Sequence, residues 1–432
     1  MTAAPSKPRF LERLALHRPE LRAWALYDWA NSAFFTVVIT AVFPVFFKRV
    51  AADGLPDDEV RRRYGLATTA CMAVAAVLGP ILGAVADYAR MKKKLFGVFL
   101  GLGVAATAAL GLVGTGQWKL AAALFGLANI GIASSFVFYD AMLPHVAREG
   151  EADRLSTTAY AVGYLGGGLC LALALGLIAL GGGAIEGEGF PARQGFVLVA
   201  VWWLVFTIPY LRRVPEPPLA LEADEHPGRN PVGVAFTRIG ETLRELKTYR
   251  HAFLMLLAFL AYSDGIGTII RMAALYAAEL EIPDRVTVGC ILLVQLVGVP
   301  FAILFGRLAG RIGAKRAILV ALAGYVGICA FASTVTTAWQ FVAMGVLVGM
   351  VQGGAQGLSR SLFASLVPRH KSAEFFGLFS TLEKFAGILG PWVFSMTATS
   401  RSAILSIAAF FVVGGILLLA VDVEAGKRAA GR

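Results

Sequence analysis

An acid and a base interrupt an apolar stretch in the second half of the chain. Asp264 and Arg271 lie within Ala252–Ala278, whose other side chains carry no formal charge. Seven residues separate them, which is two helical turns, so both lie on one face of a helix. Such a pair could handle a zwitterionic solute, because the carboxylate can take up an amine or a proton and the guanidinium can hold a carboxylate. An internal ion pair is the alternative, although a separation of ~10 Å argues against direct contact in a straight helix.

The first apolar run carries another acid near its start. Asp28 has Asn31 on the same helical face three residues later, and the two form a second candidate site. Asp28 is expected only one or two turns inside the helix, so an interaction with the helix dipole stays an open alternative. The flanking Tyr27 and Trp29 could be aromatic residues of the membrane interface.

Two later segments add polar side chains. Gln352 and Gln356 are expected to line a cavity, because lipid cannot satisfy an amide. Arg360 is expected at the inner end of this span as a snorkelling or loop-latching residue. Glu383 and Lys384 are adjacent, so they point about 100° apart on a helix and should not pair face to face, and at least one should face the cavity. The span that carries Gln352 and Gln356 also has four glycines at i+4 spacing, which predicts a ridge for close helix packing: Gly345, Gly349, Gly353 and Gly357.

These residues need a membrane-spanning scaffold, and the composition predicts one. Of 432 residues, 57% are hydrophobic and 16% charged, whereas a soluble domain carries about 25% charged residues. Ala317–Ser359 is long enough for two crossings, folded back at Ser333–Thr337, and with Ala252–Ala278 and Phe375–Thr399 the expected count is twelve. The other charge-free runs are Trp29–Phe47, Tyr64–Ala86, Leu95–Trp118, Leu120–Tyr139, Leu155–Ile185, Gln194–Leu211, Val286–Gly306 and Ser402–Val421. The sequence therefore predicts an all-α polytopic membrane protein with twelve transmembrane helices.

The distribution of Lys and Arg predicts the orientation. With a cytoplasmic N-terminus, the inner segments hold 28 of the 39 basic residues and the outer segments hold nine, while Arg271 and Lys384 lie inside spans. This asymmetry follows the positive-inside rule, although Arg61–Arg63 breaks it, and it places both termini in the cytoplasm. The net charge of +11 then reflects topology, and we expect no nucleic-acid partner.

The cysteines and histidines show no pattern typical of catalysis. All four cysteines fall inside predicted spans without metal-ligand spacing, and the five histidines fall at inner helix ends or in loops. The sequence has no Gly-rich phosphate loop, nucleophile elbow or paired-ligand motif. We expect no metal, no cofactor and no enzymatic activity.

The chain divides at its longest polar stretch into two similar parts. Residues 1–211 form the expected N-terminal six-helix half, 212–250 a cytoplasmic linker loop, and 251–432 the C-terminal six-helix half. Three pairs of matching segments lie 223 or 224 residues apart, which indicates a parallel repeat of the major facilitator kind. The pairs are Gly83–Asp87 with Gly306–Gly310, Leu143-Pro144 with Val367-Pro368, and Gly163–Gly166 with Gly387–Gly390.

The first copy of the repeated loop is a candidate conformational latch. Gly83 would let its span pack closely on a neighbour. Asp87 would lie near a helix C-terminus, which is unfavourable unless another helix N-terminus or an arginine takes up its charge. Arg90 begins the basic run that follows, and a purely topological anchor is the alternative reading. The second copy has Gly310 in place of the acid, so a latch there should be absent or weaker.

Four motifs resemble one branch of the major facilitator superfamily, that of the vacuolar amino-acid effluxers (autophagy-related). They are Tyr27–Ala33, Tyr262–Gly265, Gly353–Ser361 and Glu374–Gly377, and the resemblance covers nearly the whole chain. It implies twelve helices, alternating access and a small solute, such as an amino acid, as cargo. We therefore expect a secondary transporter in a bacterial cytoplasmic membrane, coupled to protons. Broad export of amphipathic compounds, and a non-transporting receptor or scaffold on the same fold, are the alternatives.

Overall fold

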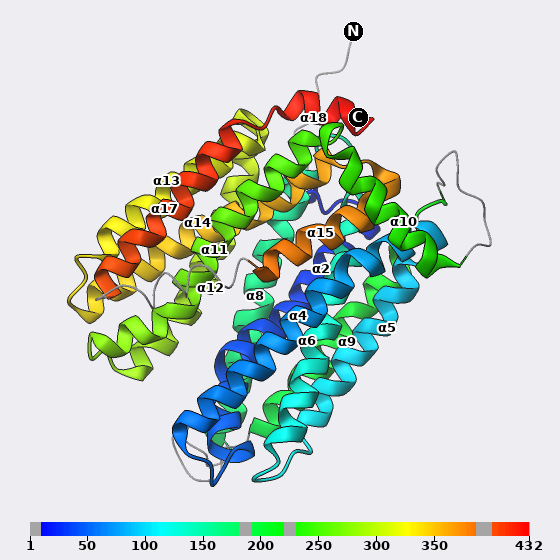
Figure 1. Ribbon diagram of the computed structural model, residues 1–432. Coiled ribbons are helices and arrows are strands. Elements are labelled where there is room, and N and C mark those ends of the chain that lie inside the picture. Colours follow the sequence, from blue (N-terminus) through cyan, green and yellow to red (C-terminus); the bar gives the residue numbers. More distant parts are fainter. Residues whose placement is uncertain (1–9, 181–191, 220–229, 386–399, 432) are drawn as a thin grey trace.

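A computed structural model describes residues 10–180, 192–219, 230–385 and 400–431, and every regular element within these ranges is helical (Figure 1). The α-helices are α1 (Phe10–Arg13), α2 (Pro19–Ala33), α3 (Phe43–Phe46), α4 (Asp57–Ala89), α5 (Lys92–Leu110), α6 (Trp118–Ala141), α7 (Leu143–Val146), α8 (Ala152–Leu180), α9 (Ala192–Arg213), α10 (Pro231–Arg244), α11 (Arg250–Glu279), α12 (Asp284–Ile312), α13 (Ala314–Ala332), α14 (Ala338–Leu366), α15 (Ser372–Phe385), α17 (Ser400–Leu419) and α18 (Val423–Ala429). Two π-helices, η1 (Phe34–Val42) and η2 (Phe47–Ala51), continue α2 and α3, and two 3₁₀-helices, η3 (Glu245–Lys247) and η4 (Arg369–Lys371), precede α11 and α15.

Each of the twelve expected spans falls wholly or partly on a described helix. Among the described residues, ten helices are long and apolar enough to cross a membrane, and a bent pair formed by α17 and α18 would be an eleventh. The expected span Phe375–Thr399 begins in α15, and its continuation lies outside the described residues. The predicted fold-back at Ser333–Thr337 is confirmed: α13 ends before it and α14 begins after it, with Thr337 and Gln340 forming a capping box.

The helices form two groups that meet near one end of the bundle. Helices α2, α4, α5, α6, α8 and α9 pack on one another, and so do α11, α12, α13, α14 and α17. In Figure 1 the groups approach each other at the end that carries α10 and α18, here called the terminal end, and diverge toward the opposite end. The groups are joined by contacts of α8 with α12 and α14, and by α15, which packs on α4 and α6 of the first group and on α11 of the second. The boundaries of two six-helix halves stay a prediction.

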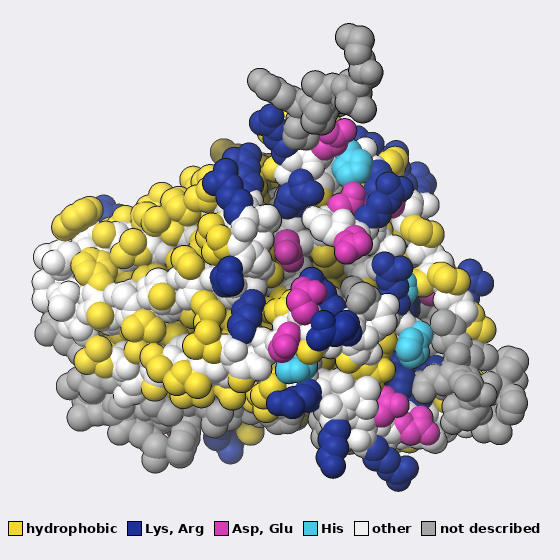
Figure 2. All heavy atoms as spheres, turned by 90° about the horizontal axis from the view of Figure 1, so that it is seen from above, with side chains coloured by type: hydrophobic (Ala, Val, Ile, Leu, Met, Phe, Trp, Pro, Cys, Tyr) yellow, Lys and Arg dark blue, Asp and Glu magenta, His cyan; other side chains and the backbone are white. Residues whose placement is uncertain are grey.

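Charged side chains gather at the terminal end. Figure 2, which views this end, shows Lys, Arg, Asp, Glu and His side chains clustered together, while hydrophobic side chains cover one flank. The linker between the groups contributes to this face. It was expected as a loop, but its described part includes α10, which packs on α4.

The glycine ridge of α14 packs as its spacing predicts. A Cβ atom on Gly353 would lie 2.7 Å from the Tyr164 ring of α8 and 2.9 Å from the Ala302 side chain of α12. A Cβ on Gly349 would lie 3.0 Å from the Val294 carbonyl oxygen of α12. The ridge therefore lets α14 approach helices of both groups.

Two glycines, Gly265 and Gly267, lie between Asp264 and Arg271. Glycine weakens a helix, but α11 runs without a break from Arg250 to Glu279. A Cβ on Gly265 would lie 2.9 Å from the ring of Phe411 in α17. This glycine therefore serves close packing between α11 and α17, and its helix-weakening tendency is overridden by that packing.

Candidate functional site

A buried arginine joins the two helix groups. Arg360 of α14 is only 2% exposed, which contradicts the expected snorkelling role. Its Nη2 lies 2.9 Å from Oδ2 of Asp28 in α2, and its Nη1 lies 3.2 Å from Oδ1 of Asp140 in α6. Sequence reasoning placed Arg360 at a helix end because its run of apolar residues stops there, and it had no means of finding two acids in the other group.

Further contacts hold the guanidinium of Arg360 in place. Its Nε donates to the hydroxyl of Ser156 in α8 at 2.8 Å, and its Nη2 donates to the Ser156 carbonyl at 3.1 Å. The guanidinium carbon lies 4.7 Å from the ring centres of Trp24 and Tyr160 and 5.4 Å from that of Tyr139. Cation–π attraction of this kind strengthens in desolvated surroundings. Three helices of the first group thus clamp one cation of the second group.

Arg360, Asp28 and Asp140, here called the charge cluster, have unequal charges. Two carboxylates face one guanidinium, so with all three ionised the cluster carries one net negative charge. Burial penalises uncompensated charge, and the cluster can relieve that penalty by taking up one proton or another cation. The predicted partner Asn31 also belongs here, because its Nδ2 donates to Oδ1 of Asp28 at 3.3 Å.

The helix-dipole reading of Asp28 is wrong. Helix α2 begins at Pro19, well before the apolar run, so Asp28 lies about 13 Å inside the helix. The helix dipole acts within the first turn. The charge of Asp28 is compensated by Arg360 instead. Asp140 was missed because it follows the charge-free run Leu120–Tyr139 and resembles a flanking residue.

Two matching tyrosine–serine pairs each include a residue that directly precedes a member of the charge cluster. Tyr27 and Ser135 join α2 to α6 at 2.6 Å, and Tyr262 and Ser359 join α11 to α14 at 2.6 Å. The two serines are 224 residues apart, the offset found in the sequence repeat. Tyr27 is fully buried, so the interfacial reading of this residue is wrong.

Asp264 and Arg271, which interrupt the apolar run Ala252–Ala278, both lie on α11. Asp264 is fully buried on α11, and its backbone carbonyl accepts a hydrogen bond from Thr268. Arg271 lies on the same helix, but its side chain is outside the described part of the structure. Their proposed cooperation therefore stays a prediction.

The remaining pathway candidates lie on α14 and α15. Gln352 and Gln356 are half-buried on α14, and Gln356 is four residues from Arg360. Glu383 and Lys384 do form a pair, with 3.5 Å between Oε2 and Nζ, contrary to our expectation. Their backbone vectors diverge, but two long side chains can bend together at a partly exposed site. The Glu383 side chain is 47% exposed.

Asp87, a candidate latch residue, lies where α4 meets α15. Its Oδ2 accepts the backbone N–H of Glu374, in the first turn of α15, at 2.9 Å. The N-terminus of a helix attracts anions, so this is the kind of contact that the loop motif predicted. Gly83 makes the approach possible, since a Cβ there would lie 2.6 Å from the Ala373 carbonyl carbon and 2.9 Å from the Glu374 Cα.

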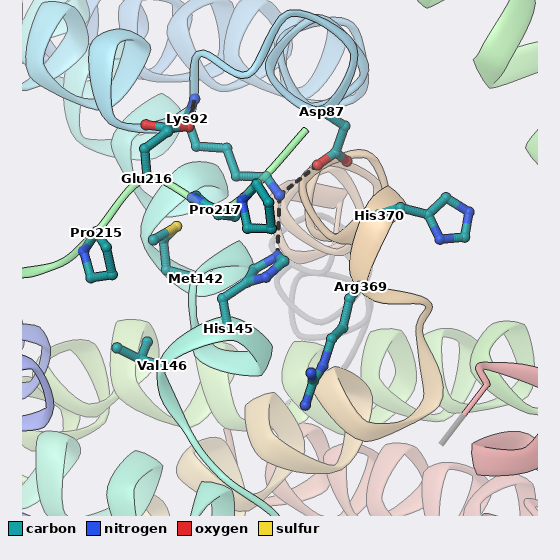
Figure 3. Close-up of a pocket in the computed structure, with 11 residues that line it drawn as sticks. Asp87, Lys92, Met142, His145, Val146, Pro215, Glu216, Pro217, Arg369 and His370 are labelled. Atoms are coloured by element: carbon teal, nitrogen blue, oxygen red, sulfur yellow. Dashed lines mark hydrogen bonds and ion pairs between the residues drawn. The ribbon is translucent and has the colours of Figure 1, made fainter. Parts of the chain in front are cut away.

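The cation beside Asp87 is Lys92 and not Arg90. Lys92 Nζ lies 2.7 Å from Asp87 Oδ1 and 3.3 Å from His145 Nε2 (Figure 3). It also lies 3.0 Å from Ser372 Oγ. Arg90 ends α4 in the left-handed region, with φ of 54°, and its Nε donates to the carbonyl of Pro217 in the linker. The turn thus directs Arg90 toward the linker.

A cavity of about 390 Å³ opens beside this contact. Figure 3 shows the Lys92 side chain reaching toward Asp87 and the His145 ring turned toward the Lys92 ammonium group, while Arg369 and His370 point away from Lys92 and Asp87. Glu216 of the linker accepts the backbone N–H groups of Lys92 and Lys93 at 2.9 and 2.8 Å, which caps α5. The lining combines the first group, the linker and η4.

The second copy of the loop packs without an acid. A Cβ on Gly306 would collide with the Thr157 hydroxyl of α8, so this glycine joins α12 to α8 as Gly83 joins α4 to α15. A Cβ on Gly310 would meet nothing within 4 Å. The glycine contact is therefore repeated, and the carboxylate contact of Asp87 has no counterpart at Gly310.

Comparison with known proteins agrees with this architecture. Residues 65–431 match the family described as vacuole effluxer Atg22 like. The chain is 36% identical over 413 residues, 93% of its length, to the uncharacterized MFS-type transporter YxiO of Bacillus subtilis, and the match covers 94% of that protein. It is 29% identical over 317 residues, 66% of its length, to autophagy-related protein 22 of Yarrowia lipolytica, of which it spans 52%.

Solved structures share the fold at low sequence identity. The human organic anion transporter MFSD10 gives a TM-score of 0.69 at 13% identity, covering 95% of this chain and 100% of that one. The proton:xylose symporter XylE gives 0.70 at 13% identity, covering 93% and 94%. The chain is therefore an integral membrane protein with the major facilitator fold, and it belongs to the family of Atg22-like vacuole effluxers, as a transporter of the MFS type.

Proposed function

We propose that this protein moves a small zwitterionic solute, of the amino-acid type, across a bacterial cytoplasmic membrane by alternating access coupled to protons. The charge cluster carries the proposal, because it joins the two helix groups through a buried arginine and two buried or half-buried acids. Alternating access requires these groups to separate at the terminal end. That movement must break the pairs of Arg360 with Asp28 and Asp140.

Separation of the cluster needs charge compensation. Leaving one member of a buried ion pair without its partner costs about 3–5 kcal/mol. A proton on one acid and a solute carboxylate on Arg360 would together replace the broken contacts. A zwitterion also brings an amine, for which the other acid is a suitable acceptor. An amphipathic compound without a carboxylate could not replace the contacts of Arg360, so we favour the zwitterion over broad amphipathic export.

Asp264 and Arg271 keep their proposed roles in the second group. Asp264 would take up a proton or an amine, and Arg271 would bind a carboxylate in a bidentate manner. The burial of Asp264 on α11 supports a functional acid, since buried ionisable residues in membranes are mostly functional. Gln352 and Gln356 would line the same route with amide groups, as would the Glu383–Lys384 pair with its charges.

The terminal end is proposed to face the cytoplasm, with both termini inside. The Lys and Arg distribution supports this orientation, and so does the gathering of charged side chains on that end in Figure 2. Cysteine reporters at position 228 and at the exposed positions 94 and 369 should then be labelled only from inside, and those at 55 and 187 from outside. Labelling of position 228 from outside would overturn the orientation.

Transport in reconstituted vesicles tests the function. A panel of radiolabelled amino acids should show uptake or release that a pH gradient stimulates. Asp28→Asn and Asp140→Asn should abolish that stimulation while downhill exchange persists, and Asp53→Asn, at an exposed position of the loop before α4, should match the wild type. Wild-type stimulation in both cluster variants would refute the cluster as the coupling site, and the absence of transport for every zwitterion tested would refute the solute class.

A further inference from the structure

The Glu374–Gly377 motif at the start of α15 has a second feature beyond the contact with Asp87. Glu374 is fully buried, and it directly precedes the apolar run Phe375–Thr399 of the expected span. Its Oε1 accepts a hydrogen bond from the hydroxyl of Thr242 in α10, and its Oε2 has no hydrogen-bond partner among the described residues. A buried carboxylate with one unsatisfied oxygen is costly when ionised.

Helix α10 connects this carboxylate to α4. It packs on α4, and its residues Ala235, Arg238 and Thr242 are buried. The guanidinium carbon of Arg238 lies 5.9 Å from the centre of the Tyr88 ring of α4, in the first group. Thr242 reaches Glu374 of α15, a helix that packs on α4 and α6 of the first group and on α11 of the second. One linker helix therefore spans the contact that must open when the terminal end opens.

A second linker contact reinforces the arrangement. Lys371 of η4 is 1% exposed, and its Nζ lies 2.9 Å from Oε2 of Glu245 in η3, directly after α10. Both the α10 helix and the residues after it thus contact the start of α15. Movement of α15 away from α4 would break the hydrogen bond between Thr242 and Glu374 and the one between Asp87 and the Glu374 N–H.

The charges around Glu374 come from every element packed on it. Burial, the largest influence, raises the pKa of Glu374 from its ordinary 4.5 to about 7, and the nearby Asp87 carboxylate of α4 acts in the same direction. The Thr242 hydrogen bond opposes this rise, as do the positive charges of Lys371 in η4 and Arg238 in α10. On the far side of Asp87, Lys92 of α5 forms its ion pair.

We propose that Glu374 is a proton-binding site in the contact between α4 and α15 at the terminal end, here called the terminal gate. Its protonation locks α10 across this contact. The proposal rests on alternating access, as inferred above. The closed gate binds the proton more tightly than an open gate in which Glu374 meets water. The lock is therefore present at low pH and is lost as the pH rises through about 7.

The size of the effect follows from the two pKa values. With a pKa of about 7 in the closed gate and 4.5 in the open gate, the ratio of closed to open molecules should fall about tenfold between pH 6 and pH 8. An acidified cytoplasm would thus hold the transporter closed on its inner side, and recovery to neutral pH would release it.

Spin labels across the gate test the proposal in the full-length protein, without substrate or pH gradient. Lys94→Cys in α5 and Arg369→Cys in η4 place labels on exposed positions of the two groups. The short-distance population should fall about tenfold relative to the long-distance one between pH 6 and pH 8. Glu374→Gln, which mimics the protonated acid, should keep the short distance at both pH values.

Two further variants separate the proton site from simple loss of structure. Thr242→Val removes a hydrogen bond that favours the ionised form, so the midpoint of the change should move to higher pH. Glu245→Gln removes a linker contact but not the acid, so it should lower the closed population at every pH while the pH slope persists. A wild-type distance distribution that is constant from pH 6 to pH 8, or an unchanged slope in Glu374→Gln, would overturn the lock. Because no transport is measured, either result would leave the proposed transport function standing.

Discussion

Replacing Arg360 with methionine tests the charge cluster most directly. The change removes the ion pairs with Asp28 and Asp140 and both hydrogen bonds to Ser156, while the apolar stem keeps most of its packing. Two carboxylates then share a buried site with no cation. Loss of one partner from a buried pair costs about 3–5 kcal/mol, and the like-charge repulsion between the two acids adds to this cost.

The expected loss can be read as a change in melting temperature. At ~2 °C per kcal/mol for a chain of this size, Arg360→Met should melt about 6–10 °C below the wild type when intrinsic fluorescence is followed in detergent at pH 8. Arg316→Met on α13 is the matched control, because it removes an exposed arginine, and it should melt within about 1 °C of the wild type.

A double variant distinguishes lost charge balance from lost packing. Adding Asp140→Asn to Arg360→Met removes one of the two uncompensated carboxylates, so the double variant should melt at a higher temperature than Arg360→Met alone. Such non-additivity is expected only for residues in contact. The reasoning fails if Arg360→Met has the melting temperature of the wild type at pH 8. It also fails if the effects of the two substitutions on the melting temperature are additive, because the cluster would then not hold the helix groups together.

Three further predictions concern the gate and the second candidate pair. Asp87→Asn keeps the hydrogen bond to the Glu374 N–H but loses the charge that pairs with Lys92. Exchange between the inward-open and outward-open states should therefore become slower while membrane insertion persists. Exchange at the wild-type rate would show that the loop is only a topological anchor. Gly377→Val would place a Cβ 2.7 Å from the Gly79 carbonyl carbon, which should cost the closed gate about 1–3 kcal/mol and increase labelling of cytoplasmic cysteine reporters. Asp264→Asn should abolish coupling to the pH gradient, and Arg271→Lys should weaken substrate binding more than expression. Misfolding of both single variants, with recovery of full transport in Asp264→Asn/Arg271→Gln, would identify a structural ion pair.

Much of the scaffold was predictable because membrane insertion is a local requirement. A bilayer core demands about 20 apolar residues per crossing, and this property can be read directly from apolar runs such as Ala317–Ser359. The need of Asp87 for a helix N-terminus was also predictable, since an acid at the end of its own helix is unfavourable there. The identity of that helix was not predictable, because the Glu374 N–H lies 287 residues further along the chain.

The tertiary structure alone decided which charges meet. Asp28 and Arg360 are 332 residues apart, and Asp140 and Arg360 are 220 apart, so no spacing rule connects them. The same holds for Lys92, which replaced Arg90 beside Asp87 because a left-handed turn at the end of α4 directs Arg90 toward the linker. Helical periodicity relates residues within one helix, whereas a charge buried between helices takes its partner from whichever chain segments the packing brings within about 3 Å. For this protein the sequence by itself determined the all-helical membrane-spanning scaffold and the places where buried charge needs a partner, and the packing of the two helix groups determined each partner.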